Sequence, residues 1–175
     1  MMAPRSELRL VERAFCLNRG IRMREESKPR RRPISRFNDR AKRVLAMAGS
    51  EATRLHREIV DPEHVLLGLL TCGGIPAKVL EDSGLKLEEA RRAVEAMTGH
   101  GDRVEVPAVA PAPGTWKIIE LAADEADRAG DETVRPEHVL LALVRQPGSA
   151  TPVLDSFGVS GDLIRQGLAS ASSGS

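Results

Sequence analysis

The same six residues, Pro-Glu-His-Val-Leu-Leu, occur twice in this chain, at 62–67 and at 136–141. When the sequence is aligned with itself at this offset of 74 residues, 61 positions from Phe37 to Met97 pair without a gap, and 18 of them are identical. One gapless register over such a length indicates a tandem duplication. The fold and any site must therefore be explained once for each repeat.

The first repeat carries four helix signals. Over 38–57, small and aliphatic residues recur at helical spacing and form one apolar stripe. Asp61-Pro62-Glu63 then places a capping residue, a proline and an acid where a helix begins. This second helix is almost wholly apolar and ends at Gly73-Gly74, and two shorter helices are expected at about 75–82 and 86–97.

The second repeat shows the same pattern, with helices expected at about 114–129, 136–145, 149–156 and 160–169. The sequence therefore predicts an all-α body of two pseudo-symmetric, superimposable four-helix repeats, with no β-sheet within 37–170. Aromatic residues make up only 2% of the chain, so the core must be built from aliphatic side chains. We expect its main members to include Leu66, Leu67, Leu140 and Leu141.

Charge and composition indicate where the domain boundaries lie. Residues 1–36 contain 11 Lys/Arg and 4 Asp/Glu, whereas residues 37–175 contain 15 and 21. We therefore expect a basic, flexible extension at 1–36 before an acidic body at 37–170, and a disordered tail at 171–175. Within the body, repeat one is 37–98, a Gly/Pro/Ala-rich linker is 99–113, and repeat two is 114–170.

The sequence lacks the motifs of several catalytic and metal sites. It has no GxxxxGK[ST], no CxxC and no HExxH. His64 and His138 each follow a glutamate at a helix start, but neither has a second ligand one helical turn away. We therefore expect these histidines to satisfy local backbone groups, and we expect no enzyme activity, no cofactor and no metal site.

Two further features bear on location. No apolar run approaches the ~20 residues that cross a bilayer, so no membrane association is expected. Cys16 and Cys72 are too few for a disulfide framework, which favours a cytoplasmic protein with free thiols.

The strongest functional signal is a resemblance to a known family. The stretches FNDRAKRVLAMAGSEATRL, PEHVLLGLL and GGIPAKVLEDSGLKLEEARRAVEAM resemble the Clp N-terminal domain, the double-repeat module at the front of Clp-family AAA+ unfoldases, especially the ClpC type. The resemblance covers residues 37 to about 169. It implies an eight-helix fold that receives substrates and adaptor proteins. Because no nucleotide-binding module follows, we expect a stand-alone N-domain protein.

The resemblance also implies a ligand. In ClpC-type members the glutamate of each such motif contacts the guanidinium of a phosphorylated arginine, and by position these residues are Glu63 and Glu137. Each is expected to face a shallow, partly exposed pocket near the start of its own repeat's first helix. Asp61 would repel a phosphate and Arg135 would attract one. We therefore expect weak phosphoarginine binding that is stronger at Glu137 than at Glu63.

Other residues complete the predicted site. The family tends to have Phe-Thr where each repeat begins, and this chain has Phe37-Asn38 in the first repeat and Pro111-Ala112 in the second. Asn38 is therefore a candidate ligand-binding residue beside its role as a helix cap. Phe37 and Trp116 are candidates for a partner surface. The counterpart of Trp116 is Lys42, so this position is expected to be at least partly exposed.

Two functions follow. The first is a non-catalytic protein-binding module of a Clp protease or chaperone system, whose partners are protein substrates, an adaptor or the Clp ATPase. The alternative is a regulator that binds nucleic acid through its basic arm, KPRRRPISR at 28–36. A disordered leader, an upstream start codon with Met23 as the real first residue, or a cleaved organellar transit peptide would also account for the N-terminal extension.

Overall fold

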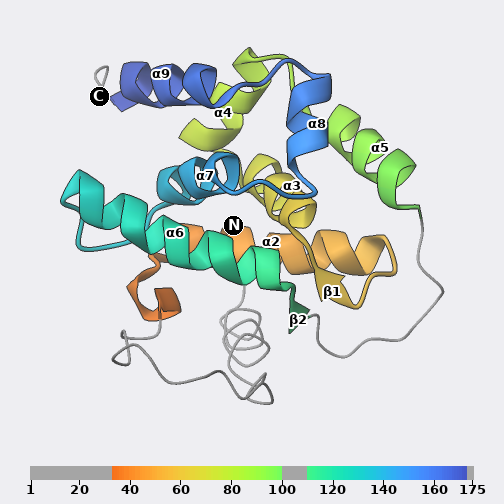
Figure 1. Ribbon diagram of the computed structural model, residues 1–175, viewed down its shortest axis with the longest axis horizontal. Coiled ribbons are helices and arrows are strands. Elements are labelled where there is room, and N and C mark those ends of the chain that lie inside the picture. The colour runs from red at the N-terminus through yellow and green to blue at the C-terminus, as the bar shows by residue number, and fades with distance from the viewer. Residues whose placement is uncertain (1–32, 100–109, 173–175) are drawn as a thin grey trace.

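The computed structural model describes residues 33–99 and 110–172. These residues contain eight α-helices, which confirms the all-α prediction (Figure 1). Repeat one consists of α2 (Asp39–Arg54), α3 (Pro62–Cys72), α4 (Ile75–Asp82) and α5 (Leu87–Thr98). Repeat two consists of α6 (Pro113–Ala129), α7 (Pro136–Arg145), α8 (Thr151–Ser156) and α9 (Gly161–Ser172).

The helix boundaries follow the duplication. Every start and end in repeat one recurs within two residues in repeat two at the 74-residue offset, and the bounds of α5 and α9 agree without any shift. The largest difference is at α8, which begins two residues later than its counterpart α4. That delay changes the loop between α7 and α8, which lies at one of the two sites described below.

The two repeats are joined by crossed backbone pairing. Strand β1 (Ile59–Val60), just before α3, runs parallel to β2 (Ala110–Pro111), just before α6. In the same way, Phe37, just before α2, forms a parallel bridge with Val134, just before α7. The expectation of no β-sheet was wrong in this detail. Each of these two pairings ties the start of one repeat's first helix to the start of the other repeat's second helix.

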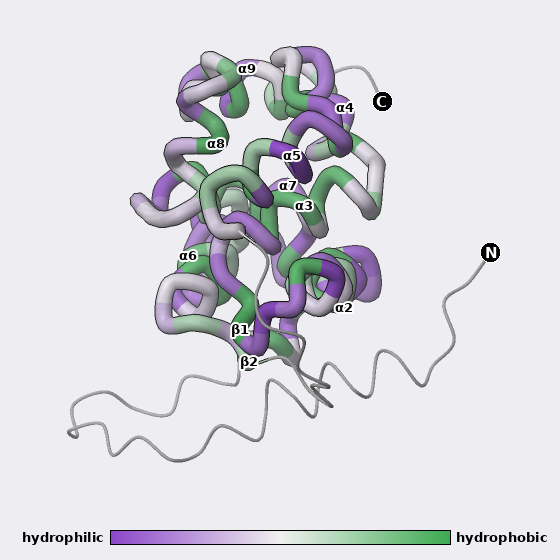
Figure 2. Tube along the Cα trace, turned by 90° about the vertical axis from the view of Figure 1, so that its right-hand side faces the viewer, coloured by the Kyte–Doolittle hydropathy of each residue, from purple (hydrophilic) through white to green (hydrophobic). Residues whose placement is uncertain are grey.

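The helices form layers that mix the repeats. In both views α2 and α6 lie at one end, α4 and α9 at the other, and α3 and α7 between them (Figures 1 and 2). Helix α3 contacts α2, α4, α5, α6 and α7. Figure 2 shows its hydrophobic stretch inside the molecule. The two repeats therefore share one core.

Three of the four leucines predicted as main core residues are confirmed as fully buried: Leu66, Leu67 and Leu140. Leu141 was predicted wrongly, because it is only half-buried. Helix α4 packs against both α3 and α7, whereas its counterpart α8 contacts mainly α5. Repeat two therefore leaves part of α7 less covered than the matching part of α3.

Close packing in repeat one depends on Gly68, in the middle of α3. A Cβ atom there would lie 2.5 Å from the carbonyl oxygen of Val44 and 2.9 Å from the amide nitrogen of Ala48. The counterpart in repeat two is Ala142, which is fully buried. Helices α2 and α3 therefore approach at this position more closely than a side chain allows.

The described structure begins inside the predicted extension. Residues 33–36 form a 3-10 turn, η1 (Pro33–Arg36), and Ile34 packs against the core. The guanidinium of Arg36 lies 2.7 Å from the Asp127 carboxylate on α6 and also donates to the carbonyl oxygens of Asp131 and Glu132. The rest of the basic extension, and the linker residues 100–109, lie outside the described residues.

Within the described part of the chain, no single helix is long and apolar enough to cross a membrane. Helices α3 and α4 reach that length and composition only together, and they are bent by 103° at the break between them. All but the last two residues of α3 are buried in the core.

Candidate functional site

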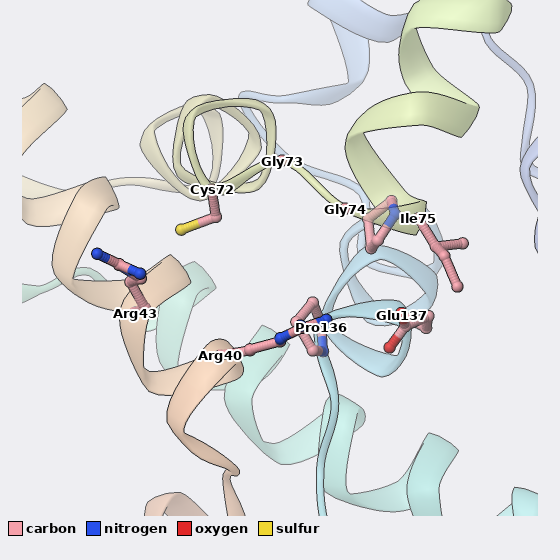
Figure 3. A pocket seen from close by; sticks show the side chains of 9 residues that line it. Arg40, Arg43, Cys72, Gly73, Gly74, Ile75, Pro136 and Glu137 are labelled. Atoms are coloured by element: carbon pink, nitrogen blue, oxygen red, sulfur yellow. The ribbon is translucent and has the colours of Figure 1, made fainter. Parts of the chain in front are cut away.

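Glu137 lines a pocket formed by both repeats, here called the Glu137 pocket. Its volume is about 300 Å³. Repeat two supplies Pro136 and Glu137 from the start of α7. Repeat one supplies everything else, from α2 and from the end of α3 to the start of α4: Arg40, Arg43, Cys72, Gly73, Gly74, Ile75 and Pro76. Figure 3 shows these side chains around the space between α2, α4 and α7.

The charges of this pocket are available to a ligand. Arg40 and Arg43 are exposed, and neither forms an ion pair with another residue of 33–99 or 110–172. In Figure 3, Arg40 extends from α2 toward Pro136, while Arg43 lies on the side of Cys72. Glu137 is half-buried, and within the same ranges its carboxylate forms no hydrogen bond or ion pair. The pocket thus offers one carboxylate and two guanidinium groups.

This arrangement corrects where the positive charge was expected. Glu137 faces the first helix of the other repeat, not of its own, because of the crossed pairing between Phe37 and Val134. Arg135 does not line the pocket; its side chain pairs with Asp131. Asn38 does not line it either, since its side-chain oxygen accepts a hydrogen bond from the Ala41 amide at 2.8 Å and caps α2.

The matching place in repeat one is closed. Here called the Glu63 site, it consists of Pro62 and Glu63 at the start of α3, Gly114 at the start of α6, and Gly148 and Ser149 in the loop between α7 and α8. Glu63 is only 3% exposed, so the expected partly exposed pocket was wrong for this residue. The Ser149 hydroxyl donates a hydrogen bond to its carboxylate.

The two histidines of the repeated motif act as predicted. Nδ1 of His64 accepts a hydrogen bond from the Asp61 amide at 2.9 Å, and Nδ1 of His138 accepts one from the Arg135 amide at 3.1 Å. Both therefore satisfy backbone groups at a helix start. Nε2 of His138 also lies 3.1 Å from the Asp131 carboxylate, whereas Nε2 of His64 is buried without a hydrogen-bond partner among the described residues.

Burial explains the electrostatics of these motifs. It lowers the pKa of His64 to about 4, and it also lowers the pKa of His138, where the positive charge of Arg135 acts in the same direction. Burial raises the pKa of Asp61, and the nearby negative charge of Glu63 raises it further. The like charges expected near Glu63 are therefore present.

Asp61, Glu63 and His64 are the group of donors best placed for a metal within the described residues, with atoms within 4.8 Å of one another. However, Nδ1 of His64 already accepts the Asp61 amide hydrogen, so in the neutral ring Nε2 carries the proton. Glu63 is engaged by Ser149. These hydrogen bonds favour a role in capping the start of α3 over coordination of an ion.

Cys72, which lines the Glu137 pocket, is a half-buried thiol. Burial raises its pKa to about 11, although the positive charge of Arg43 acts in the opposite direction. The thiolate is the nucleophilic form of cysteine. At neutral pH this thiol is therefore protonated and a weak nucleophile.

The two aromatic candidates for a partner surface differ. Phe37 is 3% exposed and belongs to the core, so its assignment to such a surface was wrong. The apolar ring is buried where the chain enters α2 and pairs with Val134. Trp116 is half-buried and packs against the core, which confirms that it is partly exposed. Its contact with a partner stays a prediction.

Sequence reasoning missed the residues that distinguish the two sites. At the 74-residue offset Arg40 corresponds to Gly114, and Ile75 corresponds to Ser149. These substitutions were visible in the alignment of the repeats. Their role could not be inferred from the alignment alone. The structure shows that each site combines the glutamate of one repeat with the residues at these two positions in the other repeat.

Comparison with known proteins gives a consistent picture. The family model described as "Clp repeat (R) N-terminal domain" matches residues 36–146 and 111–173. The chain is 42% identical over 135 residues to the "negative regulator of genetic competence ClpC/MecB" of Bacillus subtilis, and 40% identical over 135 residues to the chaperone protein ClpB of Oceanobacillus iheyensis. The match covers 76% of this chain but only 16% and 17% of these relatives.

The fold is also found in solved structures. The N-terminal domain of ClpD from Arabidopsis thaliana aligns with a TM-score of 0.64 at 21% identity, over 79% of this chain and 95% of that domain. The N-domain of ClpV from Vibrio cholerae aligns with a TM-score of 0.62 at 18% identity, over 83% and 95%. At these identities the comparison supports the fold.

Proposed function

This chain belongs to the Clp repeat N-terminal domain family, and we propose that it is a non-catalytic protein-binding module of a Clp chaperone or protease system. Its partners in this proposal are protein substrates, an adaptor or the Clp ATPase, in the cytoplasm. The chain spans about a sixth of the length of the curated relatives it matches, and that match is to the N-terminal domain of Clp ATPases. We therefore propose for this chain the protein binding of an N-terminal domain, and not the ATPase activity of the longer relatives.

The observation that carries the proposal is the unpaired charge of the Glu137 pocket. A carboxylate and two guanidinium groups border one cavity of about 300 Å³. Such a pocket suits a ligand side chain that carries a cation and an anion together. Phosphoarginine is such a side chain: its guanidinium would pair with Glu137, and its phosphate with Arg40 and Arg43.

The same charges select against simpler ligands. An unmodified arginine would meet Glu137 but would be repelled by Arg40 and Arg43, which carry the same charge. A phosphoserine would meet the arginines but leave Glu137 without a cation. Ile75, which is 37% exposed at the pocket, offers an apolar surface to the aliphatic part of an arginine side chain.

The test is the affinity of the full chain for a peptide with one phosphoarginine, measured by isothermal titration calorimetry against the same peptide with arginine. We expect only the phosphorylated peptide to bind, and Arg40→Gln to weaken it about tenfold or more, since hydrogen bonds to charged groups contribute roughly 1.5–3 kcal/mol. The matched control is Arg92→Gln, which removes an exposed arginine on α5 outside the pocket. Equal losses in both variants, or equal binding of both peptides, would refute the proposal.

Trp116 is proposed as part of the surface that contacts the larger partner. It is half-buried near the start of α6, and tryptophan is over-represented among interface residues that dominate binding energy. Capture of a Clp component from native extract by the full chain, lost in Trp116→Ala with an unchanged melting temperature, would support this role. Undiminished capture by that variant would exclude it.

A further inference from the structure

Ser149 distinguishes the closed Glu63 site from the open Glu137 pocket. Its hydroxyl donates to the Glu63 carboxylate, although the two residues are 86 positions apart in the sequence. The counterpart of Ser149 at the Glu137 pocket is Ile75, whose side chain has no donor. Glu63 is 3% exposed, whereas Glu137 is half-buried and lines an open pocket.

The Ser149 loop lies close to the Pro62 side chain at the start of α3. A Cβ atom on Gly148 would lie 3.5 Å from Cγ of Pro62, and one on Gly114 would lie 3.2 Å from the same atom. The loop is also fixed from within, because the Gly148 amide donates to the Thr151 hydroxyl at 3.2 Å and the Thr151 amide donates to the Gly148 carbonyl at 3.0 Å. Pro62 thus lies near both the start of α6 and this loop.

The closed site also lacks the cation of the open one. Gly114 has no side chain where the Glu137 pocket has Arg40. A buried carboxylate requires a hydrogen-bond donor, and Ser149 provides one from within the chain. The Ser149 hydroxyl thus binds the carboxylate that a donor group of a ligand would otherwise meet.

We propose that Ser149 is an intramolecular occupant of the Glu63 site, so that the chain has one open site at Glu137 and one self-occupied site at Glu63. This inference rests on the proposed function for the identity of the external ligand. The chain then binds one modified side chain at a time, and two marks on one substrate gain no avidity from a single copy of this chain. A ligand reaches Glu63 only if the loop between α7 and α8 moves away.

The experiment is a calorimetric titration of the full chain with the phosphoarginine peptide, read as stoichiometry. We expect one equivalent for the native chain and for Ser156→Ala, a control that removes a serine hydroxyl at the end of α8. For Ser149→Ala we expect a second, weaker equivalent, because Glu63 loses its internal donor.

A second measurement needs no ligand. Hydrogen–deuterium exchange of the amides at 148–151 should become about tenfold faster in Ser149→Ala than in Ser156→Ala, in keeping with the loss of one hydrogen bond to a charged group. Unchanged exchange would overturn the inference, and so would two equivalents bound by the native chain. If the native chain bound no peptide at all, the proposed function would fail, while the exchange comparison would still decide whether Ser149 closes the site.

Discussion

The two repeats share a backbone plan and differ at the few side chains that decide what each site does. In repeat one, Asp61 caps the buried helix α3, and Glu63 lies in its first turn. The Glu63 side chain is buried and accepts a hydrogen bond from Ser149. In repeat two, Arg135 takes the place of Asp61, and Glu137 stays half-buried beside an open pocket. The two repeats thus share one fold but differ in the exposure of the equivalent glutamate.

The comparison shows that each site is built from residues of both repeats. Each glutamate lies on the second helix of its own repeat. The residues around it come from the other repeat, from the start of its first helix and from the loop between its second and third helices. The crossed pairings of β1 with β2 and of Phe37 with Val134 set this arrangement. A substitution in one repeat therefore alters the site that carries the other repeat's glutamate.

The largest expected effect tests whether the repeats share one core. Leu66 and Leu140 are equivalent and fully buried, and a buried Leu→Ala change costs about 2–5 kcal/mol. We expect Leu66→Ala and Leu140→Ala each to lower the stability of one cooperative transition by an amount in this range. Urea unfolding followed by circular dichroism measures this. Two separate transitions, with only one of them shifted, would show that the repeats unfold independently.

The next effect separates the two histidines. The folded pKa of His64 is about 4, below the roughly 6.5 of an unfolded histidine, so its neutral form is favoured by folding. Its contribution is complete above pH 6.5 and is lost as the pH falls toward 4, by up to about 3 kcal/mol. In an NMR titration of the imidazole C–H signals, His64 should titrate below His138, which lies beside Asp131. The reverse order would contradict this account of repeat one.

A smaller effect concerns the contact between the first two helices of each repeat. Gly68→Ala would place a methyl group 2.5 Å from the Val44 carbonyl oxygen, and overpacking of this kind costs about 1–3 kcal/mol. The reciprocal change, Ala142→Gly, should cost only about 0.5–1 kcal/mol, mainly through backbone entropy. The two melting temperatures give the comparison directly. Similar losses would mean that α2 and α3 are no closer than α6 and α7.

Most of the fold could be predicted from the sequence. The duplication, the apolar stripes and the Asp-Pro-Glu and Gly-Gly signals place the helices of the first repeat, and the 74-residue offset places those of the second. Helices could be predicted because their capping and periodicity signals involve residues only a few positions apart in the sequence. The two-residue strands escaped prediction because backbone pairing between residues about 50 or 100 positions apart has no local signature.

The candidate site could be predicted only in part. Glu63 and Glu137 were identified by the repeated motif, and Asp61 raises the negative charge near Glu63 as expected. Arg135 does not line the Glu137 pocket, since its side chain pairs with Asp131, four residues earlier, and its contact with a phosphate stays a prediction. Arg40, Arg43 and Ser149 were missed because each belongs to the other repeat from the glutamate whose site it lines.

The most direct test of the central claim compares the two equivalent glutamates. Glu63→Gln keeps an acceptor for the Ser149 hydroxyl, and Glu137→Gln removes the negative charge of the open pocket. The affinity of the full chain for a phosphoarginine peptide should fall about tenfold or more in Glu137→Gln, which corresponds to roughly 1.4 kcal/mol. It should stay within about twofold of the native value in Glu63→Gln, a change of at most ~0.4 kcal/mol. Equal losses in the two variants, or a loss confined to Glu63→Gln, would contradict the account.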